Sequence, residues 1–442
     1  MTMHRESCVV RLDSSVPALV LKVGQYPVHS GSLGVLRTLG RCGVPVYAIT
    51  EPGLPPAAAS RYLTGRFVWR ATGRERPDML IPGLLAAGER IGRRSVIVAI
   101  DDEAAVLAAE HREELTEHFL IPDVAPGLPR RMASKVGLFE LCRHHDIPTP
   151  ALVTPASVAE VAEFAATASF PVVMKNADPW QRRVHPVVAG TTVIGSPDEL
   201  LDIVSDASAD GHRAGDGAPD FILQEYLPRQ YSQDWVVHLY SDADSNCTVV
   251  LTGMKLRSWP PDAGVTACGY SMANPDIAAL AERFCKQIGY HGVGDLDWRL
   301  DLRDGQYRLV DFNPRPGNQF RLFETESGVD VVRALHMDMT DRNVPPGREV
   351  LGRRLIVEHV DVPARLVYGL RGLRGSQTGP PGPDGAASAR QHRGAARTEY
   401  AWLATDDPLP FFVMIPHAVR SAAAELGRRL RGTLRRDKPA SG

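Results

Sequence analysis

One stretch, Gly294 to Arg315, constrains the fold of this chain more than any other part of the sequence. It contains two strand patterns separated by Asp304-Gly305, a pair of residues that favours a hairpin turn. A three-residue loop with Gly305 in the left-handed conformation would pair Leu302 with Gln306. The sequence therefore predicts an antiparallel hairpin in this register.

The predicted register sets acidic side chains against each other. Asp297 lies opposite Asp311, and the two-residue period of a strand puts Asn313 on the same face as Asp311. Directly opposed carboxylates destabilise a hairpin unless a cation lies between them. Oxygen ligands without Cys or His are typical of Mg²⁺ or Mn²⁺ sites. We therefore predict a divalent metal site at these three residues, with a solvated acidic strand face as the alternative.

Lysine is rare in this chain, so the positions that keep it are informative. Only six of the 50 lysines and arginines are lysines. Lys135 opens a predicted helix after Ser134, Lys175 ends an apolar strand, and Lys255 shares a strand face with Arg257. A phosphate group at a helix N-terminus meets free N–H groups as well as the ammonium. Each lysine alone could be a surface charge, but with the acidic hairpin they predict a nucleoside triphosphate site. No Walker A motif is present, which excludes a P-loop scaffold.

The segment Phe221 to Pro228 is an apolar strand that runs into polar and aromatic residues. Where such a strand stops pairing, its backbone groups could hydrogen-bond the edge of an adenine ring. An ordinary edge strand has the same pattern, and the segment alone does not decide between them.

The first part of the chain has the pattern of a parallel sheet. Pro17–Gly24 and Gly43–Thr50 are apolar strands around a glycine-bounded helix, and Ser95–Ile100 is a further buried strand. Strand, helix and strand in this order predict βαβ units, so residues 16–125 are expected to form a Rossmann-like domain. From residue 126 onwards, the mixture of strands and helices predicts an antiparallel α+β region.

Composition divides the rest of the chain. Residues 346–370 are expected to form a trailing structured segment, and the Gly-, Pro-, Ala- and Arg-rich residues 371–397 a disordered insertion, because they can bury little apolar surface. Residues 398–442 should contain a basic helix from about His417 to Arg436. Val419 and three leucines give this helix one apolar face, for which docking on the body is favoured over membrane contact.

Global composition excludes several classes of protein. At 442 residues the chain should form several domains. Its 50 basic and 52 acidic residues give no electrostatic basis for nucleic-acid binding. The six cysteines show no disulfide or zinc spacing. No apolar run is long enough to span a membrane, and the first residues do not resemble a secretory signal. These features predict a cytoplasmic protein.

Taken together, the motifs resemble the ATP-grasp superfamily over most of residues 16–340. They occur in the family's order, namely a Rossmann-like domain, Ser134-Lys135 before a helix, the strand Phe170–Lys175, the segment Gln224–Pro228 and acidic strands ending in Asp311–Arg315. The resemblance implies an α/β plus α+β architecture, with a Rossmann-like pre-ATP-grasp domain at 16–125. An ATP-grasp domain at 126–345 would follow, made of two α+β subdomains that clasp ATP.

The resemblance also implies roles for individual residues. Lys135 and Lys175 would contact the phosphates of ATP. The other expected nucleotide contacts are Gln224, Glu225, Tyr226 and Leu227 at the adenine, Asp234 at the ribose, and Arg257. Magnesium would be held by Asp297, Asp311 and Asn313, and the transferring phosphoryl group or acyl phosphate would be stabilised by Lys255 and Arg315.

Three features depart from the family pattern. The metal glutamates of the family are replaced by aspartates at 297 and 311, which have a shorter reach. The loop after Lys175, normally glycine-rich, has no glycine before Gly190. Asp295 stands where peptide-forming relatives can carry an arginine, which bears on the acyl acceptor.

The resulting functional hypothesis is an ATP-dependent carboxylate–amine ligase that acts through an acyl phosphate and uses ATP with Mg²⁺ or Mn²⁺. Its substrates would be a small acid, such as an amino acid or small peptide, and an amine. Arg315 and Arg321 could each bind a substrate carboxylate, with a structural ion pair as an equal alternative for Arg321. The alternatives are an ATP-grasp enzyme with a carboxylase-like or thiol acceptor, and a nucleotide-binding regulatory protein. A homodimer, and a carrier or partner bound by the C-terminal basic helix, are also possible.

Overall fold

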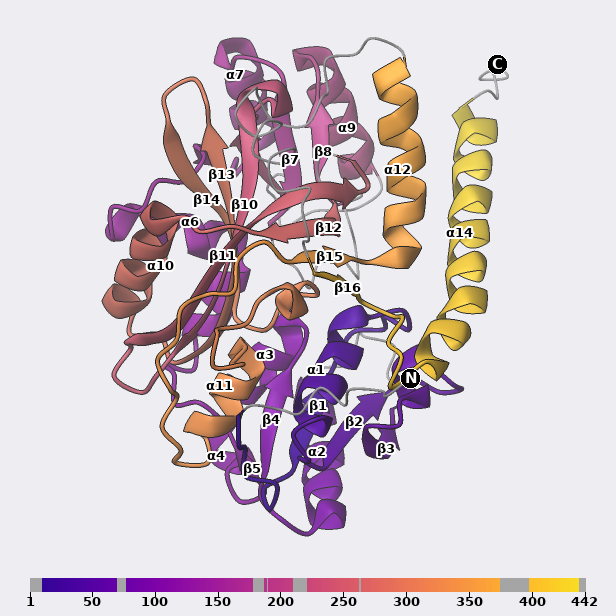
Figure 1. Cartoon of the computed structure of the whole chain (residues 1–442). Helices are drawn as coiled ribbons and strands as arrows, with labels where there is room; N and C mark the ends of the chain where they lie inside the picture. Colours follow the sequence, from indigo (N-terminus) through magenta and orange to yellow (C-terminus); the bar gives the residue numbers. More distant parts are fainter. Residues whose placement is uncertain are drawn as a thin grey trace.

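The computed structural model describes residues 10–69, 77–177, 187–188, 190–209, 221–261, 264–373 and 397–436. Three sheets organise these residues (Figure 1). A five-stranded sheet built by the beginning of the chain lies at the bottom of the view. A seven-stranded sheet occupies the middle, and a four-stranded sheet with helices α7 and α9 lies at the top.

The five-stranded sheet is entirely parallel, in the order β3-β2-β1-β4-β5. Its central strand β1 is buried at every position, as expected of a strand covered on both faces. Its strands are β1 (Ala18–Leu21), β2 (Val46–Thr50), β3 (Leu63–Val68), β4 (Ser95–Ala99) and β5 (Phe119–Leu120). Its helices are α1 (Ser30–Gly40), α2 (Pro77–Ile91), α3 (Asp102–Glu110) and α4 (Arg112–Leu115), with the short 3₁₀ helix η1 (Pro56–Ala59). The predicted parallel sheet is therefore present, with β3 and β5 as strands that the sequence analysis did not include.

The seven-stranded sheet has the order β14-β13-β10-β11-β12-β15-β16 and is antiparallel except between β15 and β16. Its strands are β10 (Ser232–Ser241), β11 (Cys247–Trp259), β12 (Val265–Ser271), β13 (Gly292–Asp301), β14 (Gln306–Asn313), β15 (Arg354–Ile356) and β16 (Thr398–Tyr400). The accompanying helices are α5 (Leu128–Ala133), α6 (Lys135–His144), α10 (Pro275–Ile288), α11 (Val331–Asp338), η2 (Arg229–Tyr231) and η3 (Phe320–Leu322). A continuous cluster of buried side chains joins this sheet to the five-stranded sheet through α1 and α11.

The four-stranded sheet is antiparallel, in the order β6-β9-β7-β8. Its strands are β6 (Leu152–Val153), β7 (Val172–Asn176), β8 (Thr192–Ile194) and β9 (Phe221–Glu225), packed with α7 (Val158–Thr167) and α9 (Pro197–Ala209). The two antiparallel sheets match the α+β architecture expected for this part of the chain.

The acidic hairpin differs from its prediction in one detail. Asp301, not Leu302, pairs with Gln306, so the loop is one residue longer than expected. A bulge then inserts Val310 as an extra residue on β14 and restores the predicted pairing of Asp297 with Asp311. Gly305 has a φ of +74°, the left-handed conformation that the turn requires.

The C-terminal part of the chain returns to the body. α12 (Glu358–Leu373) includes the first three residues of the expected insertion, whose residues 374–396 lie outside the described part. The chain re-enters as β16, buries Trp402 completely and continues into α14 (Leu409–Arg436). This helix begins before the expected His417. α12 and α14 rise beside each other at one side of the molecule (Figure 1).

The expected docking of α14 is only partly correct. The helix packs on the body through Phe411, Met414 and Ala418, whereas Val419 of the predicted apolar face is 63% exposed. Among the described residues, no helix has the length and apolar character to cross a membrane.

The cysteines also depart from expectation at one position. Cys142, Cys247, Cys268 and Cys285 are free thiols. Cys42, in contrast, takes part in a disulfide bond.

Candidate functional site

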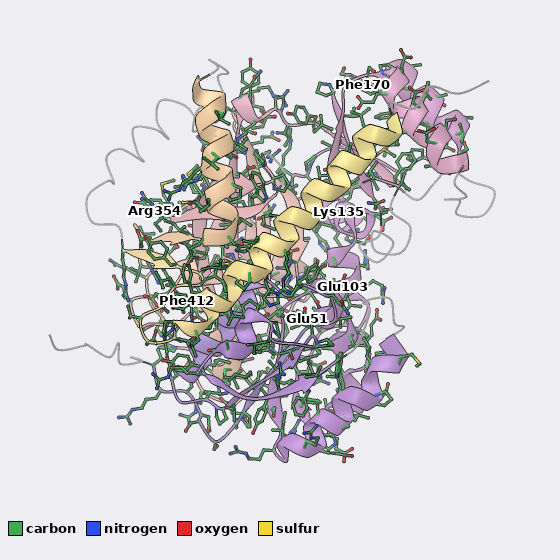
Figure 2. The ribbon with its side chains drawn as sticks, turned by 90° about the vertical axis from the view of Figure 1, so that its right-hand side faces the viewer. Glu51, Glu103, Lys135, Phe170, Arg354 and Phe412 are labelled. Carbon is green, nitrogen blue, oxygen red and sulfur yellow. The ribbon has the colours of Figure 1, made fainter. Side chains whose placement is uncertain are left out.

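Two adjoining cavities, of about 580 and 150 Å³, lie among the three sheets. Both are lined by Lys175, Lys255, Asp297 and Asp311, so they form one continuous site. In Figure 2, Lys135 of the larger cavity lies in the middle of the molecule, between Glu103 of the first domain and Phe170 of the four-stranded unit. The larger cavity is bounded by the first domain, and the smaller one by β9.

The acidic hairpin forms one wall of this site. Asp297 pairs in register with Asp311, and Asp295 with Asn313. A lysine neutralises each opposed carboxylate. Lys255 Nζ lies 2.7 Å from Asp297 Oδ1, and Lys135 Nζ lies 2.5 Å from Asp311 Oδ1. The structure therefore brings all three predicted metal ligands and two predicted phosphate-binding lysines together.

Local electrostatics favour the charged forms of Asp311 and Lys255. Although burial opposes it, the ammonium of Lys135 lowers the pKa of Asp311. Burial also opposes the charged form of Lys255, but Asp297 raises the pKa of this lysine. Each of these two shifts favours the charged form of the group, the carboxylate of Asp311 and the ammonium of Lys255.

Asp295 and Lys175 are shifted towards their neutral forms. Burial, followed by the charge of Asp297, raises the pKa of Asp295 to about 7. Burial, followed by the charge of Lys135, lowers the pKa of Lys175 to about 7. Such strong shifts in a cleft are typical of functional sites.

The donor set fits a hard divalent cation. Among the described residues, Asp297, Asp311 and Asn313 offer oxygen atoms to the larger cavity, and the buried Asp297 Oδ1 lies beside Lys255 Nζ. In the same part of the chain, no cluster of three or more His, Cys, Asp or Glu side chains is arranged for a metal. Two carboxylates and an amide suit Mg²⁺, which uses few protein ligands when phosphate oxygens complete its shell.

The smaller cavity contains most of the expected nucleotide contacts. Lys175 Nζ on β7 donates to Gln224 Oε1 on the neighbouring β9 at 3.0 Å. Gln224, Glu225 and Leu227 line this cavity, whereas Tyr226 does not. Three of the four residues predicted to contact the adenine therefore reach the site.

Asp234 and Arg257 are placed differently from their predicted roles. Asp234 lines the smaller cavity, but its carboxylate is 2.7 Å from Arg299 Nε and 3.6 Å from Arg229. Arg257 lines neither cavity and pairs with Asp361 of α12 at 2.7 Å. Arg299, which the sequence analysis missed, lines the smaller cavity instead.

Arg315 links the hairpin to the first domain. Its Nη2 donates to Asn313 Oδ1 at 3.0 Å, and its Nε donates to Asp102 Oδ1 of α3 at 3.0 Å. Although burial opposes it, Asp102 and then Asp295 raise the pKa of Arg315. Arg321, in contrast, lies outside both cavities and forms the structural ion pair considered for it, with Asp330 at 2.8 Å.

Comparison with solved structures identifies this arrangement. The chain aligns with a biotin carboxylase–ATP-analogue complex from Campylobacter jejuni (TM-score 0.56, 15% identity, 76% of this chain and 74% of the other). It also aligns with N5-carboxyaminoimidazole synthetase from Staphylococcus aureus (TM-score 0.57, 10% identity, 81% and 86%). L-amino acid ligase from Bacillus licheniformis is similar to the same degree (TM-score 0.54, 13% identity, 75% and 75%). These are ATP-grasp enzymes. The chain has the ATP-grasp fold.

Comparison of sequences finds one curated relative. Over 272 residues the chain is 26% identical to D-aspartate ligase of Enterococcus faecium (strain Aus0004). The match covers 58% of this chain and 62% of that ligase, so it spans less than two thirds of the relative. No family model matches the chain.

The site also contains residues that the sequence analysis did not single out. The larger cavity is lined on the side of the first domain by His29, Asp102 and Asn318, and by His359 of α12. No local motif marks these residues, since each comes from a different part of the chain and gains its place only through folding.

Proposed function

We propose that this chain is an ATP-dependent ligase that joins a carboxylate to an amine through an acyl phosphate. One observation carries the proposal: cationic side chains meet two opposed carboxylates in the larger cavity, beside the smaller cavity that Gln224, Glu225 and Leu227 line. Phosphoryl transfer needs such positioning and charge neutralisation rather than a protein nucleophile. The similarity to D-aspartate ligase favours an amine as the acceptor.

The reaction would proceed in two steps. A carboxylate oxygen of the acid attacks the γ-phosphorus of ATP, the bond to the ADP oxygen breaks, and ADP leaves with the electron pair. The amine nitrogen then attacks the acyl carbon, inorganic phosphate leaves, and the nitrogen loses a proton. Lys135 and Lys175 would bind the phosphates, while Lys255 and Arg315 would neutralise charge on the transferring group.

Mg²⁺ or Mn²⁺ would be held by Asp297, Asp311 and Asn313. When bound, the ion neutralises charge on the phosphate oxygens and orients them. Gln224, Glu225 and Leu227 would bind the adenine. Asp234, engaged by Arg299, would reach the ribose only if that ion pair opens, so its proposed contact is the least supported by the geometry.

ATP turnover tests the proposal directly. Purified protein with Mg²⁺ and ATP is assayed over pooled amino acids and small acids, and ADP with phosphate is measured against AMP with pyrophosphate. We expect ADP formation that requires an acid and an amine. Asp311→Asn should lower it by about 100-fold or more, because it removes a charged ligand of the proposed metal ion, which would neutralise the phosphate oxygens. The matched control is Asp304→Asn, at the exposed tip of the same hairpin.

Other products would point to the alternatives. AMP release would contradict an acyl phosphate intermediate. Acid-dependent ADP formation with bicarbonate or a thiol in place of the amine would indicate the carboxylase-like or thiol-ligase alternative. ATP binding without turnover would support the regulatory alternative.

The organisation around this reaction is part of the proposal. We propose a pre-ATP-grasp domain at 16–125, an ATP-grasp domain at 126–345, a trailing segment at 346–370 and a C-terminal segment at 398–442, in a cytoplasmic protein. A homodimer, and a carrier or partner recruited by α14, would be compatible with small-molecule turnover.

A further inference from the structure

One wall of the larger cavity carries three side chains that each present an N–H donor, and these come from the first domain, from the segment between β14 and η3, and from α12. They are His29, Asn318 and His359. In each side chain, the acceptor atom already accepts a hydrogen bond from another group of the protein.

His29 precedes α1 and caps its first turn. Its Nδ1 accepts a hydrogen bond from the backbone N–H of Ser32 at 3.1 Å. A neutral imidazole that accepts at Nδ1 carries its proton on Nε2. No described residue is hydrogen-bonded to His29 Nε2, so this N–H is available to a ligand in the cavity.

Asn318 is oriented by the same turn. Its Oδ1 accepts from the backbone N–H of Gly31 at 3.2 Å, and its Nδ2 amide, the donating end, has no partner in the described part of the chain. A side chain at Gly31 would come within 2.9 Å of both Asn318 Oδ1 and His29 Cε1. The two donors therefore lie close together over a position that requires glycine.

His359 is fixed by the C-terminal segment. The indole Nε1–H of the fully buried Trp402 donates to His359 Nδ1 at 2.9 Å, with the two rings nearly perpendicular. The proton of the neutral His359 ring is therefore also on Nε2, and this atom has no partner among the described residues.

Both histidines are neutral hydrogen-bond donors. Burial, followed by the charges of Lys22 and Arg315, lowers the pKa of His29 to about 3. Burial lowers the pKa of His359 to about 4. Three N–H donors on one wall, with Arg315 on the same cavity, favour a ligand with several acceptor oxygens, and a carboxylate is such a ligand.

We propose that His29, Asn318 and His359 form a subsite for a carboxylate of the substrate that does not react. This inference rests on the proposed function and deepens it. The substrate bound between the first domain and the hairpin would be an amino acid or another compound with a carboxylate besides its reacting group. Its reacting group would face Arg315 and Lys255, and its second carboxylate would accept from the three N–H groups.

Binding with paired probes tests the subsite without turnover. Dissociation constants are measured by calorimetry, with Mg²⁺ and a non-hydrolysable ATP analogue, for D-aspartate, L-alanine and L-glutamate and for the α-carboxamide of each. We expect at least one acid to bind about tenfold or more tighter than its amide, because the amide nitrogen would meet protein donors only. His29→Phe and His359→Phe should each weaken binding of the acid and reduce its preference over the amide. The affinity for the nucleotide should stay unchanged.

Two further variants separate contact from structure. His29→Gln keeps a side-chain donor and should restore part of the preference, whereas His111→Phe, at a partly exposed histidine outside both cavities, is a control that should leave it unchanged. Preference for the acid that survives in the double variant His29→Phe/His359→Phe would overturn the proposal, and so would equal binding of acids and amides or no binding of any probe. Failure of the ligase reaction would instead appear in the turnover assay, with the binding preference intact.

Discussion

At the scale of single residues, the site is a set of charged groups that compensate one another. The positions along the acidic hairpin could be predicted, because alternation in a strand and the paucity of lysine are visible in the sequence. Asp297, Asp311, Lys135 and Lys255 do meet in one cavity. His29, Asn318 and His359 could not be predicted, since nothing local distinguishes a histidine with a fixed tautomer from any other.

Lys175 provides a pH test at this scale. The pKa of this lysine falls from 10.5 in its ordinary state to about 7 in the fold, first because of burial. Between these values the unfolded chain binds more protons than the folded chain, so this residue makes stability rise with pH from 7 towards 10.5. Below pH 7 the full cost of the buried charge is present in the folded state.

We therefore expect Lys175→Met to stabilise the nucleotide-free protein most at pH 6, with the gain shrinking as the pH rises to 10. Urea denaturation of both proteins at intervals of one pH unit measures this difference. A constant difference across the range would mean that Lys175 keeps its ordinary pKa in the folded chain.

At the scale of elements, the hairpin shows what local rules predict and where they stop. The Asp-Gly turn and the two-residue period correctly predict that Asp297 faces Asp311. They miss the longer loop and the bulge at Val310, two changes that cancel in register. A bulge depends on packing against neighbouring strands, so a turn motif does not predict it. The same holds for β16, a short strand whose pairing partner β15 lies some 40 residues earlier.

The turn itself can be tested through Gly305. Its φ of +74° is unfavourable for residues with a Cβ, although no atom lies within 4 Å of the position of that Cβ. Gly305→Ala should therefore destabilise the protein by about 1 kcal/mol through the backbone alone. Gly369→Ala, inside α12 and equally free of contacts, should stabilise it by a similar amount, up to about 1 kcal/mol. Chemical denaturation measures both, and equal signs would contradict the conformational explanation.

At the scale of the whole molecule, the C-terminal segment is part of the body. Asp407 pairs with Arg37 of α1 at 3.0 Å, and Arg37 also donates to the carbonyl of Trp402 at 2.7 Å. Asp406 pairs with Arg41 at 2.9 Å. Through Trp402 and His359 the same segment reaches the wall of the larger cavity. This arrangement implies that the residues after 370 are needed for a stable fold and for the wall of the larger cavity.

Two truncations decide the point. Removing residues 371–442 takes away Trp402, whose deletion alone costs about 3–5 kcal/mol, and leaves the buried Arg37 without its carboxylate, which costs a similar amount. We expect this variant to fail to fold or to lose most of its thermal stability.

Removing only residues 423–442 keeps Phe411, Met414 and Ala418 on the body, so the melting temperature should change by no more than about 2 °C. A partner bound by α14 should then be sought with the shorter truncation, because only that variant separates recruitment from folding. Equal melting temperatures for the full chain and for residues 1–370 would show that the segment is an appendage after all.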